Sequence, residues 1–227
     1  MSMDDFLILK LDGPLQGWGR ESYEGLRPSE LFPGRSALLG LLGACLGIER
    51  DDAAGHGKLA SSVNFAVRVD TILCPVTSKP LRRQKLTDYH TVQNAREAYR
   101  GLKCHDTIQT WREYWQDSRY TVVVWLKEKA EYSLDEIQTA VLKPVYTPVL
   151  GRKSCPLARP LYETIVKAES CESALLMVEP LCGTIYSDVP LSNSKRLRVR
   201  DVPIVHQPRK FASRTVYMQA QGVNHAS

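Results

Sequence analysis

The stretch that decides the fold reads Pro33-Gly-Arg-Ser-Ala-Leu-Leu-Gly-Leu-Leu-Gly-Ala-Cys-Leu-Gly47. Ser36 follows a Pro-Gly turn and is the kind of residue that caps the N-terminus of a helix, so a helix is predicted from this point. The residues behind Ser36 are apolar on nearly every side, and a helix of that kind must be buried. Gly40, Gly43 and Gly47 lie three and four residues apart, which predicts a smooth stripe that packs closely on a sheet.

The start of this helix is also a candidate site for an anion. Arg35 stands beside backbone N–H groups that have no partner within the helix, and such groups bind phosphate well. The alternative is an arginine that lies over the helix start with no ligand.

The segments around this helix predict an α+β fold. Alternating or continuous apolar residues predict three strands, and a Ser133–Glu136 capping box predicts a second helix; the segments are Phe6–Leu11, Asn64–Leu73, Tyr120–Leu126 and Ser133–Leu142. Strand, helix, strand, insertion, strand and helix follow in that order, which fits a modified ferredoxin-like βαββαβ plan, the plan of RRM-like sheets. We expect one domain over residues 1–160 and a small β-rich part over residues 161–227.

Length and composition favour a folded protein without a membrane span. The chain has 227 residues, of which 43% are hydrophobic, so it can form a packed core. Its longest apolar run, Ala37 to Ile48, is shorter than the roughly 20 residues that a membrane span requires. An acidic start argues against a secretory signal, so we expect a cytoplasmic protein. The six cysteines are scattered, which predicts reduced thiols and no metal site, and we expect no cofactor.

Positive charge is confined to two segments. Residues 79–112 carry eight basic and three acidic side chains, and residues 195–227 carry seven basic and one acidic, whereas the rest of the chain has an acidic excess. In the first segment, cations alternate with aromatic rings, which is the composition of a surface for single-stranded nucleic acid. A solvated basic face is the alternative. The second segment alternates basic and apolar residues from Lys195 onward, which predicts a strand whose charged face meets either solvent or phosphate.

Two glycine-containing loops add donors. Residues 13–19 contain Gln16 and Trp18 but lack a phosphate-binding P-loop motif. Residues 146–156 contain Gly151, Arg152, Lys153 and Ser154, whose backbone and side chains could donate to phosphate. A plain surface turn is the alternative for this second loop.

The sequence contains no hydrolase motif. Its five histidines form no metal-binding or nucleophile pattern. A metal-independent ribonuclease needs only a base near a 2′-hydroxyl and a cation for the phosphorane, and the basic insertion contains such groups in Tyr89, His90, Lys103 and His105. Ribonuclease activity therefore stands as the alternative to a binding function.

Several blocks of the sequence resemble one protein family. The blocks are Gly13–Gly19, Arg27–Pro28, Phe32–Ile48, Asp88–Val92, Tyr99–Lys103, Thr107–Tyr114, Leu142–Pro144, Tyr146–Leu157 and Arg209–Arg214, and together they run through nearly the whole chain. They resemble the RAMP superfamily of CRISPR-associated proteins, and within it the type I-E Cascade subunits that bind the 5′ handle of the CRISPR RNA. The resemblance implies a β-hairpin thumb at about residues 78–115. It implies neighbouring CasC and CasA subunits, and contact with target DNA only indirectly through the guide. It also implies a non-catalytic role, because a separate subunit cuts the precursor RNA in this subtype.

The candidate RNA-binding residues combine the charge pattern with this resemblance. Lys and Arg would neutralise phosphate, rings would stack on bases, and the glutamines would contact base edges. The set is Gln16, Trp18, Arg35, Ser36, Tyr89, His90, Arg100, Lys103, Gln109, Arg112, Gly151, Arg152, Lys153 and Ser154.

Overall fold

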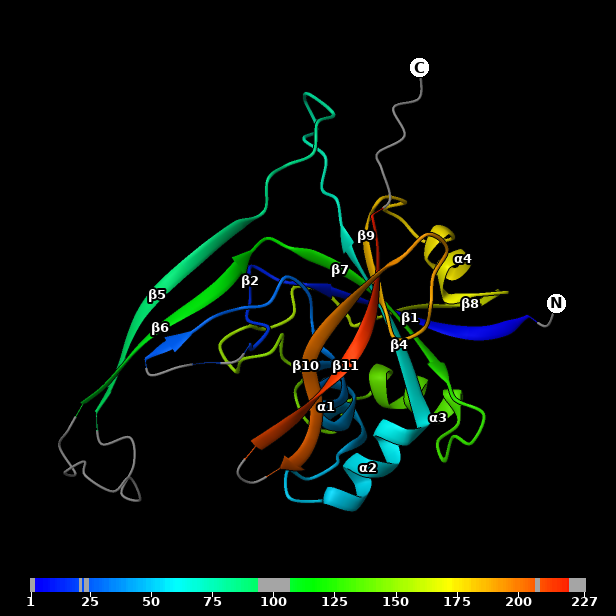
Figure 1. The fold of residues 1–227 in the computed structure, drawn as a ribbon, viewed down its shortest axis with the longest axis horizontal. Coiled ribbons are helices and arrows are strands. Elements are labelled where there is room, and N and C mark those ends of the chain that lie inside the picture. The colour runs from blue at the N-terminus through cyan, green and yellow to red at the C-terminus, as the bar shows by residue number, and fades with distance from the viewer. Residues whose placement is uncertain (1–2, 21, 23–24, 94–106, 207–208, 221–227) are drawn as a thin grey trace.

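The protein is built around a seven-stranded sheet (Figure 1). A computed structural model describes residues 3–20, 22, 25–93, 107–206 and 209–220, and the side chains of residues 205–209 are not described. Every neighbouring pair of strands in this sheet is antiparallel. In spatial order the strands are β10 (Lys195–His206), β11 (Arg209–Ala220), β9 (Gly183–Ser187), β4 (Val63–Asp70), β7 (Arg119–Leu126), β1 (Asp4–Asp12) and β8 (Tyr162–Ala168).

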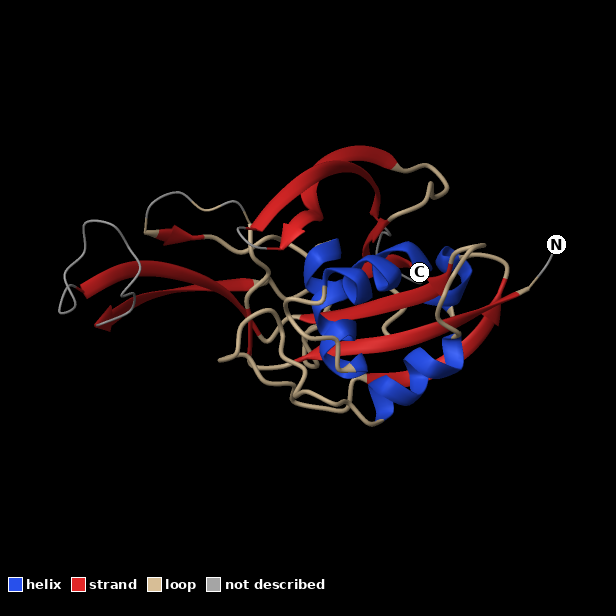
Figure 2. Cartoon of the chain, turned by 90° about the horizontal axis from the view of Figure 1, so that it is seen from below, coloured by secondary structure: helices blue, strands red, loops and turns tan. Residues whose placement is uncertain are grey.

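A long hairpin forms most of a second sheet. Its strands are β5 (Gln84–Gln93) and β6 (Thr107–Gln116), which pair antiparallel along their full length. Two short strands, β2 (Leu15–Gln16) and β3 (Leu26–Arg27), also pair with β6. Figure 2 shows the β5–β6 hairpin projecting away from the helices and the main sheet. The basic insertion of the sequence therefore forms an arm that is largely free of the core.

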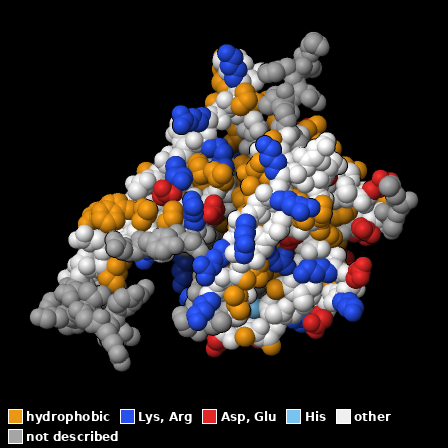
Figure 3. Space-filling model, viewed as in Figure 1, with side chains coloured by type: hydrophobic (Ala, Val, Ile, Leu, Met, Phe, Trp, Pro, Cys, Tyr) orange, Lys and Arg blue, Asp and Glu red, His pale blue; other side chains and the backbone are white. Residues whose placement is uncertain are grey.

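The C-terminal strands continue the main sheet. β9 pairs with β4, β11 pairs with β9, and β10 pairs with β11. β8 lies at the opposite edge of the same sheet, beside β1. The predicted boundary near residue 160 thus does not coincide with a change of sheet, although residues 161–227 are rich in strands. Lys and Arg side chains lie over the β10–β11 hairpin (Figure 3).

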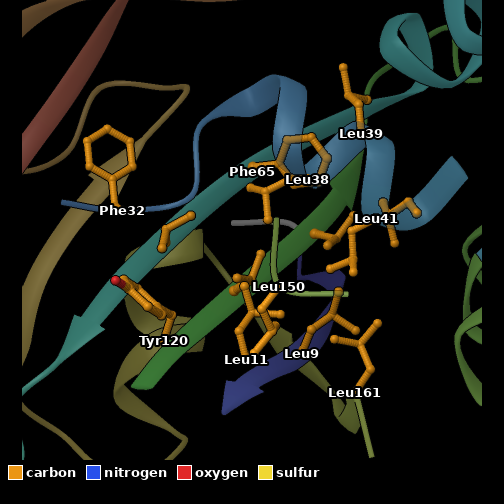
Figure 4. Close-up of a cluster of buried hydrophobic side chains, with 14 of the residues drawn as sticks. Leu9, Leu11, Phe32, Leu38, Leu39, Leu41, Phe65, Tyr120, Leu150 and Leu161 are labelled. Carbon is orange, nitrogen blue, oxygen red and sulfur yellow. The ribbon is translucent and has the colours of Figure 1, made fainter. Parts of the chain in front are cut away.

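Helices cover both faces of the sheet. Along β1, Leu7, Leu9 and Leu11 point into the larger core, whereas Phe6 and Ile8 point into a smaller core on the other face. Because both faces are covered, most residues of β1, β4 and β7 are buried, including the charged side chains of Lys10, Arg68 and Asp70. Figure 4 shows part of the larger core, where leucines from the first helix meet the side chains of these strands.

The first helix is buried, as predicted, but its details differ. α1 spans Arg35–Leu46, and its N-cap is Gly34 rather than Ser36. The expected glycine stripe is wrong: a Cβ at Gly40 would meet open space, and Gly47 ends the helix with φ of +74°. A left-handed residue at this position is a common helix stop, which explains the second glycine without close packing on a sheet.

The described residues form three further helices. The predicted helix at Ser133–Leu142 is confirmed: α3 spans Leu134–Leu142, and the Ser133–Glu136 capping box is present. α2 (Ala53–Ser62) and α4 (Cys171–Leu176) were not predicted. α4 covers the smaller core, while α1 and α3 contribute to the larger one.

Five cysteines lie in the described part of the chain and all are free thiols. Cys45, Cys155 and Cys171 are buried, and burial raises the pKa of Cys45 and of Cys171 to about 11. Cys104 lies outside the described residues. Within the described ranges, none of the helices is long and apolar enough to cross a membrane.

Candidate nucleic-acid interface

The register of the β5–β6 hairpin sorts its side chains onto two faces. Residues directly opposite each other in an antiparallel pair share a face, and neighbours along a strand alternate. Tyr89 lies opposite Trp111, Thr91 opposite Gln109, and Lys85 opposite Trp115. Thr87 lies opposite Glu113 between these pairs, and the eight side chains define what we term the aromatic face of the hairpin.

Tyr89 and Trp111 form an exposed aromatic pair. Their ring centroids are 5.3 Å apart at an interplanar angle of 49°, and the residues are 52% and 45% exposed. Large rings left in water on a projecting arm lose the burial that usually stabilises them, so such a pair indicates a binding surface. Rings of this kind accept a nucleobase of any sequence by stacking.

Cations stand over the aromatic ring at the base of this face. The Arg83 guanidinium lies 4.1 Å from the centroid of Trp115, and the Lys85 ammonium lies 4.9 Å from it. Arg83 also donates a hydrogen bond to the carbonyl of Leu31 at 2.9 Å. Burial lowers the pKa of Arg83 from its ordinary value, yet a guanidinium stays protonated in proteins. Glu113 lies on the same face and accepts a hydrogen bond from Lys85 Nζ at 2.8 Å, so the base of the aromatic face carries two cations and one carboxylate.

The opposite face of the hairpin is polar in its middle, where Asp88, His90, Thr110 and Arg112 lie, and Leu86, Tyr114, Val92 and Ile108 lie toward its two ends; we term it the polar face. His90 Nδ1 lies 3.7 Å from Asp88, and Arg112 Nε donates to Thr110 Oγ1 at 3.1 Å. Of the predicted residues of the hairpin, Tyr89 and Gln109 thus lie on the aromatic face, while His90 and Arg112 lie on the polar face. A single ligand strand on one face would meet only half of them.

The two glycine-containing loops are packed against each other. The Gly17 N–H donates to the carbonyl of Leu150 at 3.1 Å. Gly151 has φ of +86°, and a Cβ there would lie 2.0 Å from the carbonyl oxygen of Gly17. The Arg152 guanidinium lies over the ring of Tyr114, 4.5 Å from its centroid, and donates to the carbonyl of Arg27 at 3.0 Å. The structure therefore joins both loops to the base of the hairpin, where Lys153 and Ser154 are exposed.

We expect Gly151→Ala to destabilise the protein by at least about 2 kcal/mol. The new methyl group would adopt a left-handed conformation and collide with backbone, and each effect is costly. Urea denaturation followed by circular dichroism measures this loss. Gly40→Ala is the matched control, because that position is open and helical, and alanine there should stabilise by about 0.5–1 kcal/mol. Equal effects at the two glycines would contradict the packed-loop interpretation.

Gln16 and Trp18 have internal roles, contrary to their selection as RNA contacts. Both are fully buried, and the Gln16 Nε2 donates to the carbonyl of Ser118. Trp18 meets the ring of Tyr120 edge-on at 5.8 Å. The first loop folds beneath the second one, so neither side chain reaches the surface, and we leave both out of the interface.

The prediction that Arg35 and Ser36 contact RNA is also wrong. The Arg35 guanidinium is buried and donates to Asp188 and to the carbonyls of Ala60 and Val63. The Arg35 N–H donates to Asp201 Oδ2 at 2.6 Å, so a carboxylate already fills the helix start that was expected to bind phosphate. Ser36 is half-buried within α1 and does not cap it.

A second arginine completes this buried network. Arg214 donates to Asp201 at 2.6 and 2.9 Å and to Asp188 at 2.5 Å. Against the lowering effect of burial, its hydrogen bond to Asp201 and the nearby carboxylate charges raise the pKa of Arg214 above its ordinary value. Two arginines and two carboxylates therefore join α1, the strand that follows α2, and the C-terminal hairpin.

The comparison with protein families decides the class of this chain. The family model of CRISPR-associated proteins described as Cas5 matches residues 6–217. The chain belongs to the Cas5 family. It is 48% identical over 223 residues to the Cascade subunit CasD of Escherichia coli K12, which covers 98% of this chain and 99% of that protein.

Solved structures share the fold of this Cas5 chain. A chain of a CRISPR RNA-guided surveillance complex has a TM-score of 0.68 at 23% identity, with coverage of 97% of this chain and 95% of the other. A crystal structure of a Cas protein has a TM-score of 0.63 at 23% identity, with coverage of 94% and 93%. The mixed α and β architecture described above is therefore that of other Cas proteins.

Some residues of the Cas5 chain were missed by sequence reasoning, and some cannot be placed. Trp111 and Lys85 belong to the aromatic face and Arg83 stands over Trp115 at its base, and the alternation of cations with rings in residues 79–112 was the signal for them. Arg100 and Lys103 lie outside the described residues. Within the described ranges, no group of three or more His, Cys, Asp or Glu side chains is arranged to hold a metal ion.

Proposed function

We propose that this chain is a non-catalytic subunit of a type I-E CRISPR Cascade complex, where it binds and caps the 5′ handle of the CRISPR RNA. The observation that carries the proposal is the exposed Tyr89–Trp111 pair on a projecting hairpin. It occurs in a chain that is 48% identical, over nearly its full length, to a Cascade subunit. A stacking surface flanked by cations suits single-stranded RNA.

We propose that the core is a modified ferredoxin-like, RAMP-type domain. Strands β1, β4, β7 and β8 are interleaved with α1, α2 and α3, and they are ordered β4-β7-β1-β8 in the sheet. This arrangement supports the βαββαβ plan, with β9–β11 added beyond β4. The thumb is the segment at about residues 78–115, of which β5 and β6 are described.

The RNA-binding residues are proposed to lie on the thumb and beside its base. On the aromatic face they are Tyr89, Trp111, Gln109 and Lys85, which offer stacking, a base-edge amide and a cation. His90 and Arg112 on the polar face, together with Gly151, Arg152, Lys153 and Ser154 beside the hairpin base, form a second group for phosphate. A protein subunit is the alternative partner for the polar face and the loop, since both combine polar and apolar side chains and are partly exposed.

The arrangement supports binding rather than cleavage. Tyr89 and His90 are consecutive residues of β5, so their side chains point to opposite faces and could not act on one phosphodiester. Lys103 and His105, the other groups considered for a ribonuclease site, lie outside the described residues. An RNA-capping role requires neither group.

We propose three classes of partner besides the RNA handle. CasC is placed next to the thumb, CasA is placed nearby, and target DNA is reached only indirectly through the guide. The projecting arm supports contact with a neighbouring subunit, because a hairpin of this length makes few contacts with its own core (Figures 1 and 2). The assembled complex would work in the cytoplasm, where its nucleic-acid targets occur.

Reconstitution of the complex with and without this chain tests the proposal. The 5′ end of the CRISPR RNA should be protected from a 5′ exonuclease when the chain is present and exposed when it is omitted. A guide whose 5′ end is equally protected in both preparations would overturn the handle-binding proposal.

Incubation of the purified chain with CRISPR repeat RNA in EDTA tests the non-catalytic role. We expect no cleavage product on a denaturing gel. A product that is lost in the His90→Ala or His105→Ala variant would establish the metal-independent ribonuclease instead.

A further inference from the structure

Strand β10 presents a row of three arginines away from the core. Arg196, Arg198 and Arg200 are exposed, whereas Leu197 and Val199 between them pack against the larger core. Alternate residues of a strand are about 6.8 Å apart, so the three guanidinium groups start from evenly spaced positions on one face. Figure 3 shows cations over this hairpin.

The neighbouring strand adds hydroxyl groups to the same face. Tyr217, Thr215 and Ser213 of β11 lie directly opposite Arg196, Arg198 and Arg200 in the register. A shallow hollow of about 390 Å³ lies among Arg196, Arg198, Ser213 and Thr215. Hydroxyls and guanidinium groups that surround a hollow are donors suited to phosphate oxygens.

The segment that carries this row is strongly basic, with seven cations and one carboxylate over residues 195–227. Asp201 is the one acidic residue among residues 195–227, and it lies inward, bound to Arg214 and to the N–H of Arg35. Among the residues that the structure describes, Arg196 and Arg198 have no ion-pair partner, and Arg200 Nε donates to the carbonyl of Phe211 at 2.9 Å. Like charges held in a row repel one another, and a bound polyanion relieves this repulsion.

We propose that the Arg196–Arg198–Arg200 face binds the phosphodiester backbone of a nucleic-acid strand that lies along β10. Period-2 arginines fit a repeating anion, and the hydroxyl groups opposite them add donors for the phosphate oxygens of a backbone. This site is separate from the thumb and does not depend on handle binding. The shared chemistry is the phosphodiester, and its source is either RNA or DNA.

Salt-dependent binding of the purified full chain tests the site. Fluorescence anisotropy would be measured with a labelled 20-nucleotide RNA, the DNA of the same sequence and its duplex, at several salt concentrations. In Arg196→Gln/Arg198→Gln/Arg200→Gln we expect the slope of log K against log salt to become shallower by about 2 for a single strand. This change of slope corresponds to an affinity of the triple variant that is about 100-fold lower than that of the wild-type chain at 0.1 M salt. The probe whose affinity changes most shows whether the bound strand is RNA or DNA.

A matched variant separates this site from net charge. Lys129→Gln/Lys143→Gln/Lys167→Gln removes the same charge from exposed positions on other elements and should leave the slope nearly unchanged. Equal behaviour of the two triple variants, or no binding of any probe by the wild-type chain, would overturn the site.

A thumb variant keeps this test distinct from that of the proposed function. Tyr89→Ala/Trp111→Ala removes stacking and should lower affinity with little change of slope. A loss of affinity confined to this thumb variant would overturn the arginine site and support handle binding. A loss of affinity confined to the arginine variant would support the arginine site and count against handle binding by the thumb.

Discussion

Replacing Tyr89 and Trp111 together with alanine is expected to lower the affinity of the chain for single-stranded RNA by about 30-fold or more. Stacking of one base on one ring contributes about 1–3 kcal/mol, and about 1.4 kcal/mol corresponds to a tenfold change in affinity. Both rings are about half exposed, so their removal should cost the fold little. Anisotropy titration with an RNA of the handle length measures the effect.

A conservative variant separates stacking from other effects. Tyr89→Phe/Trp111→Phe keeps two aromatic faces on the hairpin and should retain most of the affinity, because stacking requires a ring rather than a particular polar group. If the alanine variant binds RNA as tightly as the wild-type chain, the aromatic face does not bind RNA, and a role in contact with a protein subunit would take its place.

Asp188→Ala is expected to destabilise the protein by about 3–5 kcal/mol. The substitution leaves the buried guanidinium of Arg35 without its carboxylate and deprives Arg214 of one of two partners. Loss of one member of a buried ion pair costs this much because the remaining charge stays desolvated. Urea denaturation monitored by tryptophan fluorescence gives the change in the free energy of unfolding.

The matched control is an exposed ion pair. Asp5 lies 3.9 Å from Lys167, and the two side chains are 50% and 73% exposed. Asp5→Ala should change the free energy of unfolding by no more than about 1 kcal/mol, since water screens such a pair. Similar losses in the free energy of unfolding for Asp5→Ala and Asp188→Ala would show that burial does not decide how much the Asp188 network stabilises the protein.

Much of the core could be predicted because local patterns and tertiary packing agree there. Val122, Val123 and Val124 are consecutive apolar residues of a strand that is covered on both faces, and Ser133 with Glu136 closes a capping box that needs no distant partner. α2 has two glycines and only two buried residues, so its sequence carried little periodicity to indicate a helix.

The candidate site was less predictable because it depends on distant contacts. Gln16 and Trp18 are polar and aromatic residues in a glycine-containing loop, which is typical of exposed ligand contacts. Their burial follows from a second loop about 135 residues later, whose Gly151 closes over Gly17. Similarly, only the register of β5 against β6 shows that Trp111 lies beside Tyr89 while His90 does not.

The bond between the Arg35 N–H and Asp201 has a consequence for the biosynthesis of the protein. The two residues are 166 positions apart, so the ribosome makes α1 long before it makes the carboxylate that completes the first turn of that helix. Asp188 and Arg214, which enclose the Arg35 side chain, are also translated late. A nascent chain that stops before Asp188 would therefore leave the Arg35 guanidinium without its carboxylate at the edge of the main core. We expect the last strands to act as a checkpoint, so that truncated products remain recognisable to proteases and only the full-length chain becomes available for assembly.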